Sequence, residues 1–149
     1  MSQSRIDLLA AAVVESINAE EFSQEATAAM AYHPIVGLPN LAAIRVWVIP
    51  ASRETAIATR SEDDDTLAVF VAVRQKIDTA STAAVAALNY YAEQIYEHLR
   101  RNHMTVSGTA YKWNASEFVE GSDAGYAPGH LEQPRVYTSV MKITYQGVV

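Results

Sequence analysis

One stretch of the chain restricts its fold more than any other, because it is apolar on both faces of an extended strand. The stretch is "TLAVFVAVRQKI", residues 66–77. Two apolar sets alternate along it: Leu67, Val69, Val71 and Val73 on one face, and Ala68, Phe70 and Ala72 on the other. A strand that is apolar on both faces is typical of the interior of a sheet. The sequence therefore predicts a sheet with residues 66–77 at its centre.

Two segments predict helices. In "SRIDLLAAAVVESIN", residues 4–18, apolar residues recur at helical spacing, and Ser4 and Asp7 are placed as an N-cap and its partner. A longer helix is predicted within residues 78–108, where Asp78, Thr79, Ser81 and Thr82 are the N-cap candidates and Ser107 with Gly108 marks the exit. Its apolar stripe is Val85, Leu88, Ala92, Ile95 and Leu99. We expect this stripe to cover the sheet.

Four further segments predict strands. Residues 22–32 follow a two-residue period, residues 42–50 are β-branched and aromatic and end at Pro50, and residues 109–120 and 135–149 form a final pair. The order is α-β-β-β-α-β-β. It predicts an α+β fold, with a mostly antiparallel sheet of about five strands covered by two helices. No repeat or linker divides the chain, so we expect one domain over residues 1–149.

Composition narrows the class of protein. The absence of cysteine excludes disulfides and cysteine-ligated metal centres. The net charge is −6 and the basic residues are scattered, which argues against specific binding of nucleic acid, although DNA could pass such a surface without being held. No apolar run approaches the roughly 20 residues needed to cross a bilayer. The sequence predicts a soluble, cytoplasmic protein that binds no membrane.

An acidic cluster, Glu62, Asp63, Asp64 and Asp65, precedes the central strand. Clustered carboxylates could bind a hard cation, but the spacing lacks the alternation and the glycine of a calcium loop. Charge runs usually lie in water, so the favoured interpretation is a solvated turn at the tip of a hairpin.

Motifs for catalysis or cofactor binding are not found. His33, His98, His103 and His130 never occur in the spacings that place two imidazoles on one metal ion. No glycine-rich phosphate loop and no nucleophile elbow occurs. We therefore expect no cofactor, no metal and no enzymatic activity.

The second helix carries more tyrosine than a solvated face needs. Tyr90, Tyr91 and Tyr96 could form a platform for nucleic-acid bases, but Tyr91 adjoins the apolar stripe. The outer face is predicted to contact a neighbouring subunit, because aromatic side chains often anchor interfaces. The candidate interface residues are Tyr90, Glu93, Tyr96, Glu97 and Tyr126.

A long segment, "GSDAGYAPGHLEQP" at residues 121–134, is rich in glycine, proline and polar residues. Loops longer than about 12 residues usually have a function. It could be a lid over an active site or an extension onto a partner. Because the sequence marks no catalytic group for a lid to cover, extension onto a partner or simple mobility is the favoured interpretation.

The ordered elements resemble a known family. The helix "RIDLLAAAVVESIN", the segment "FSQEATAAMAYHP", the strand "AIRVWVIP", the meander through "TLAVFVAVRQKID", the helix "STAAVAALNYYAEQIYEHL" and the C-terminal strand pair look like the small tail-completion proteins of tailed bacteriophages, and among them the tail terminators. The resemblance spans nearly the whole chain and rests on the order of elements, without a diagnostic motif.

The resemblance implies a structural virion protein. Terminators form a hexameric ring that caps the finished tail tube, halts its polymerisation and offers a surface to the neck. The implied partners are copies of the chain, the tail tube protein and a neck or stopper protein, with DNA as passing cargo. The acids at residues 62–65 would then face the lumen or the tube. The implied location is the tail or neck of the virion, assembled in the host cytoplasm.

Two alternatives stay open: another head–tail connector, such as a head-completion or stopper protein, and a small enzyme or ligand-binding domain with an unrecognised site.

Overall fold

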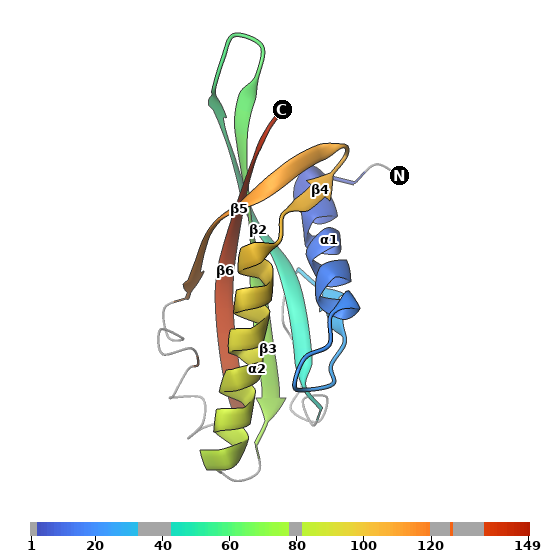
Figure 1. The fold of residues 1–149 in the computed structure, drawn as a ribbon, viewed down its shortest axis with the longest axis vertical. Coiled ribbons are helices and arrows are strands. Elements are labelled where there is room, and N and C mark those ends of the chain that lie inside the picture. The colour runs from blue at the N-terminus through green and yellow to red at the C-terminus, as the bar shows by residue number, and fades with distance from the viewer. Residues whose placement is uncertain (1–2, 33–42, 78–81, 120–125, 127–135) are drawn as a thin grey trace.

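Two helices lie on one face of a six-stranded sheet in the computed structural model, which describes residues 3–32, 43–77, 82–119, 126 and 136–149 (Figure 1). The helices are α1 (Arg5–Ala19) and α2 (Thr82–Arg101). The strands are β1 (Ala28–Met30), β2 (Arg45–Ile57), β3 (Asp63–Lys76), β4 (Met104–Val106), β5 (Thr109–Phe118) and β6 (Val136–Val148). The predicted α+β class is confirmed, with one strand more than expected.

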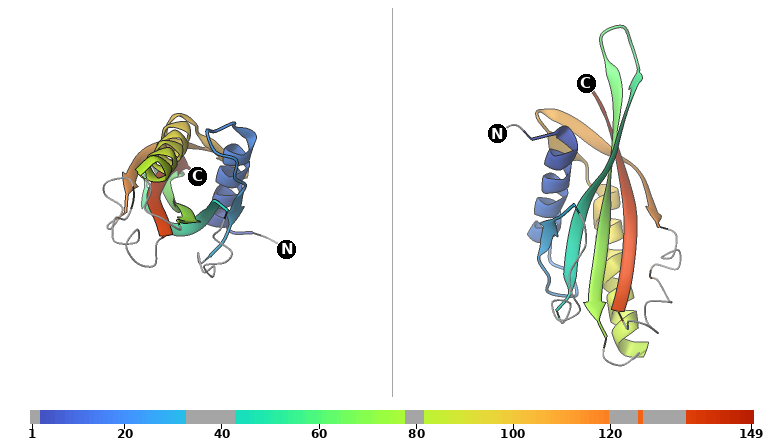
Figure 2. Two further views of the ribbon diagram at one scale, coloured as in Figure 1. Left: turned by 90° about the horizontal axis from the view of Figure 1, so that it is seen from below. Right: turned by 180° about the vertical axis from the view of Figure 1, so that it is seen from behind.

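The sheet has the order β1-β2-β3-β6-β5-β4. Only β1 runs parallel to its neighbour, and the other four pairings are antiparallel. Strand β3 lies between β2 and β6, as its two apolar faces predict. Seen along its long axis, the sheet curls around the helices into a half-barrel, with both helices on the concave side (Figure 2).

The core fills the space between the concave face and the helices. The stripe of α2 is confirmed: Leu88, Ala92, Ile95 and Leu99 are buried, together with Tyr91, and Val85 is half-buried. Opposite them lie the valines of β3 and alternate residues of β6, namely Tyr137, Ser139, Met141, Ile143 and Tyr145. Ser4 caps the N-terminus of α1: its hydroxyl accepts a hydrogen bond from the amide of Asp7 at 3.2 Å, as the sequence predicts.

Two expected strands have different bounds. The segment 22–32 is extended only at β1, where the side chain of Asn18 binds both the amide and the carbonyl of Ala28 and so ties the strand to α1. Pro50 does not end β2. The pairing with β3 shifts register between Pro50 and Ser52, and a bulge of this kind accommodates a residue that has no amide hydrogen.

The sequence does not predict strand β4. It forms a short hairpin with β5 through Ser107 and Gly108, which both have positive φ, at 50° and 80°. Two central residues with positive φ make the turn that best suits a tight hairpin. Within the predicted loop 121–134, only Tyr126 belongs to the described residues, and the candidate caps Asp78, Thr79 and Ser81 also lie outside them.

Candidate functional site

The most prominent feature of the surface is an arm, defined here as residues 52–64, in which the β2–β3 hairpin projects beyond the rest of the sheet (Figure 1). Every residue from Ser52 to Glu62 is exposed. Ile57 is 85% exposed, which is unusual for a large apolar side chain at the end of a strand. The arm therefore presents surface that its own chain does not bury.

The tip of the arm, residues 58–62, is held by hydrogen bonds of its own. The amides of Ala58 and Thr59 donate to the carbonyl of Glu62 at 3.2 and 2.9 Å. The hydroxyl of Thr59 accepts from the amides of Ser61 and Glu62 at 3.3 and 3.1 Å. A turn closed in this way has few alternative conformations, so Arg60 and Ser61 project from a defined backbone.

The base of the arm is anchored on one buried carboxylate. Asp65 is fully buried. Its Oδ1 accepts hydrogen bonds from Nε of Arg53 at 2.8 Å and from the hydroxyl of Thr55 at 3.1 Å. Its Oδ2 accepts from the hydroxyl of Tyr111 at 2.7 Å. Tyr111 in turn accepts from Nη1 of Arg5 at 3.1 Å, so the network joins β2, β3, β5 and α1.

Two opposing effects set the pKa of Asp65. Burial by itself raises the pKa of a carboxyl group, because it disfavours the charged form. The hydrogen bonds from Arg53, Tyr111 and Thr55 stabilise the carboxylate and outweigh burial, so the pKa of Asp65 lies below its ordinary value. Asp65 is therefore ionised at neutral pH and acts as the acceptor that fixes the arm.

The strands beside Asp65 meet at very close range. Gly147 on β6 lies under the ring of Tyr111, and a Cβ at this position would be 2.9 Å from Cδ1 of that ring. Contacts of this kind leave no room for a larger residue. Gly147 thus allows Tyr111 to reach Asp65.

The prediction for the acidic cluster is partly wrong. Only Glu62 lies in the exposed turn, whereas Asp63 and Asp64 are half-buried in β3 and Asp65 is fully buried. The cause is the two-residue period of a strand, which puts Asp65 on the same face as Leu67. Whether the cluster faces a lumen or a tail tube stays a prediction.

The candidate interface residues differ in how far they are exposed. Tyr90 is 57% exposed and Glu93 is exposed on the outer face of α2. The rings of Tyr96 and Tyr126 pack within the chain instead. Tyr96 stacks on Phe118 at 5.3 Å and donates to the carbonyl of Ser116, and Tyr126 stacks on Tyr137 at 6.2 Å. Glu97 is half-exposed and pairs with Arg100 at 3.6 Å.

His98 has a structural place at the junction of the helices. Its Nε2 lies 3.0 Å from the hydroxyl of Ser16 on α1, and its ring meets that of Phe22 edge to face. His103 is exposed, and His33 and His130 lie outside the described residues. Among the residues that the structure describes, no three histidine, aspartate or glutamate side chains are grouped as metal ligands would be.

Neither described helix is long and apolar enough to span a bilayer.

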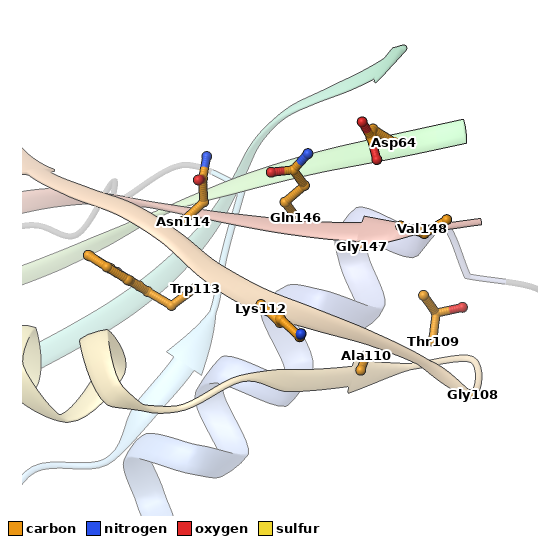
Figure 3. A pocket seen from close by; sticks show the side chains of 10 residues that line it. All are labelled: Asp64, Gly108, Thr109, Ala110, Lys112, Trp113, Asn114, Gln146, Gly147 and Val148. Atoms are coloured by element: carbon orange, nitrogen blue, oxygen red, sulfur yellow. The ribbon is translucent and has the colours of Figure 1, made fainter. Parts of the chain in front are cut away.

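A groove of about 630 Å³ opens beside the base of the arm (Figure 3). It lies where β5 leaves β6. The pairing of these two strands ends at Lys112 and Gln146, whereas β6 stays paired with β3 as far as Asp64 and Val148. Side chains of both charges, one hydroxyl and two carboxamides line it: Asp64, Thr109, Lys112, Asn114 and Gln146.

Comparisons with known proteins give only structural similarities. No protein-family model and no curated protein matches the chain. A chain from the virion of a native gene transfer agent particle is similar with a TM-score of 0.49 and 14% sequence identity, over 99% of this chain and 98% of that chain. A second solved structure, described only by a sequence identifier, has a TM-score of 0.48 and 17% identity, over 98% of this chain and 96% of that one.

Proposed function

We propose that this chain is a structural protein of a phage-like particle, and specifically a ring-forming tail terminator that caps the tail tube and joins it to the neck. The observation that carries the proposal is the arm, a stiff projection whose exposed side chains include Ile57. An exposed apolar residue on a projecting hairpin gains most when it is buried by another molecule. The order of elements in the fold agrees with the resemblance from which the terminator role was inferred.

The outer face of α2 is the proposed contact between neighbouring subunits. Tyr90 offers a large, mostly exposed ring there, while Glu93 lies about one turn further along the helix. A tyrosine buried against a partner is a frequent centre of binding energy. Tyr96 and Tyr126 are less available for such a contact, because each stacks on a ring of its own chain.

The proposed ring is tested by its symmetry. Native mass spectrometry and negative-stain images of the purified chain are expected to give sixfold rings. Twelvefold rings, or a chain that stays monomeric at high micromolar concentration, would contradict the terminator role. Sixfold rings that bind portal and not tail tube would favour another head–tail connector, such as a head-completion or stopper protein.

A pair of matched variants tests the proposed contact. Tyr90→Ala is expected to weaken ring assembly by roughly tenfold or more, as removal of a central interface tyrosine does. Tyr32→Ala is the control, because Tyr32 is 59% exposed and Tyr90 is 57% exposed. If the two variants assemble equally well, the contact does not lie on α2.

A further inference from the structure

The tip of the arm and the groove have complementary charges. The tip carries Arg60 and Glu62 on either side of Ser61, and all three are exposed. The groove carries Asp64 and Lys112. A tip that enters the groove can therefore pair each of its charges with an opposite one, and complementary charges also disfavour wrong partners.

The tip is ready to bind without rearrangement. Four hydrogen bonds hold its backbone around Thr59 and Glu62. Binding by a preorganised segment loses less conformational entropy than binding by a loop that must first become ordered. The buried network at Asp65 likewise fixes the direction of the arm.

The groove is suited to a narrow, polar segment of chain. Its sides are the separating strands β5 and β6, and its lining offers the carboxamides of Asn114 and Gln146 and the hydroxyl of Thr109 (Figure 3). Such groups can both donate hydrogen bonds to a peptide backbone and accept them from it. Backbone groups in the exposed turn of a hairpin can bind such partners in place of water.

The arm and the groove lie at the same end of the molecule. The arm and the end of β6 point towards one end of the long axis, and the turn between β4 and β5 lies in the same half of the molecule (Figure 1). Asp64 at the base of the arm lines the groove, whereas the tip, residues 58–62, projects away from the groove of its own chain and does not fill it (Figure 1). Two copies that met at this end across a two-fold axis would each present a tip to the groove of the other, and both contacts would form together, as in an isologous interface.

We propose that two copies of this chain exchange their arms, with the tip of each, residues 58–62, seated in the groove of the other between β5 and β6. The contact pairs Arg60 with Asp64 and Glu62 with Lys112 across the two copies. It is a second interface, separate from the face of α2 and independent of whether the chain forms a ring.

Cysteine cross-linking tests this contact directly, because the natural chain has no cysteine. Ser61→Cys and Asn114→Cys are made as separate variants, mixed, and treated with a short bifunctional maleimide. The mixture is expected to give a cross-linked heterodimer. Ser61→Cys mixed with Glu15→Cys is the control, since Glu15 is exposed on α1, away from the groove. Cross-linking no stronger than in this control would overturn the proposal.

A charge-reversal pair tests the chemistry of the contact. Lys112→Glu is expected to weaken pairing at this end by roughly tenfold, measured by sedimentation velocity, because it places like charges opposite each other. Adding Glu62→Lys to the same chain is expected to restore pairing. A double variant that pairs no better than Lys112→Glu alone would contradict the assignment.

The two proposals, arm exchange and the terminator role, can be refuted independently of each other. Rings in negative-stain images without a cross-link between the Ser61→Cys and Asn114→Cys variants would refute arm exchange and leave the terminator role standing. A cross-linked pair of copies that never forms rings would refute the terminator role and leave arm exchange standing.

Discussion

Replacing Asp65 by asparagine removes the charge at the base of the arm and keeps the shape of the side chain. In the native chain both carboxylate oxygens accept hydrogen bonds, one from Tyr111 and the other from Arg53 and Thr55. Asparagine keeps one oxygen and replaces the other with a group that only donates. The amide oxygen can still accept the hydrogen bonds from Arg53 and Thr55. The hydroxyl of Tyr111 then loses its acceptor inside the protein.

The expected loss follows from these contacts. A hydrogen bond to a buried charged group contributes about 2 kcal/mol, which is the share of Tyr111. The bonds to Arg53 and Thr55 weaken when their acceptor becomes neutral, by about 1 kcal/mol together, because the Arg53 side chain is 44% exposed and screened by solvent. We expect Asp65→Asn to lower the free energy of unfolding by about 3 kcal/mol.

Urea denaturation, followed by circular dichroism, measures this change. The midpoint should fall while the slope of the free energy against urea concentration stays constant. Two variants rank the contributions: Tyr111→Phe should lower stability by about 2 kcal/mol and Arg53→Ala by at most about 1 kcal/mol. If Asp65→Asn lowers stability no more than Arg53→Ala does, the buried carboxylate does not anchor the arm.

The loss of stability caused by Asp65→Asn should also depend on pH, and the lowered pKa of Asp65 fixes the direction of that dependence. A carboxyl group whose pKa is lower in the folded state stabilises the fold above its unfolded pKa of about 3.9, and this stability is lost as the pH falls through the folded value. The difference in the free energy of unfolding between the native chain and Asp65→Asn should be constant from about pH 5 to 8 and should shrink below about pH 4. A difference that grows on acidification would refute the assignment.

Other substitutions give further checks. Gly147→Ala should lower stability by about 1–3 kcal/mol in urea, because the new Cβ would collide with the ring of Tyr111, and an unchanged midpoint would show that the ring can move aside. Tyr91→Phe should leave stability equal or up to about 1 kcal/mol higher, since its buried hydroxyl has no partner among the described residues; a loss above that size would reveal one. Ser107→Gly should raise the melting temperature, because Ser107 has a φ of 50°, and a lower melting temperature would contradict this.

Local periodicity is enough to predict the elements that are long and regular. Residues 66–77 alternate so strictly that their central place in the sheet follows from the pattern, and the stripe of α2 likewise predicts its buried face. Shorter elements carry too few residues for a period. Strand β4 covers only Met104–Val106, and the Ser107–Gly108 pair, which the sequence pattern indicates as the exit of a helix, is the turn of a hairpin.

The place of Asp65 needs information from far along the chain. Its spacing from Leu67 predicts an inward side chain, but the neighbouring acids favour a solvated cluster. The group that decides between these possibilities is Tyr111, 46 residues away. No local pattern contains that contact, nor the approach of β6 to β3, because both depend on how distant segments pair.

The position of β6 has a consequence for how the molecule folds. Strand β6 comes after the other described strands in sequence, yet it joins β3 on one side to β5 on the other. Until β6 arrives, the hairpin of β2 and β3 and the hairpin of β4 and β5 share no strand pairing, and β3 has a free edge rich in valine. Contacts between segments so distant in sequence form slowly. We therefore expect the sheet to close in a single late step, so that the edge of β3 that β6 covers stays open to aggregation until β6 has formed its pairings.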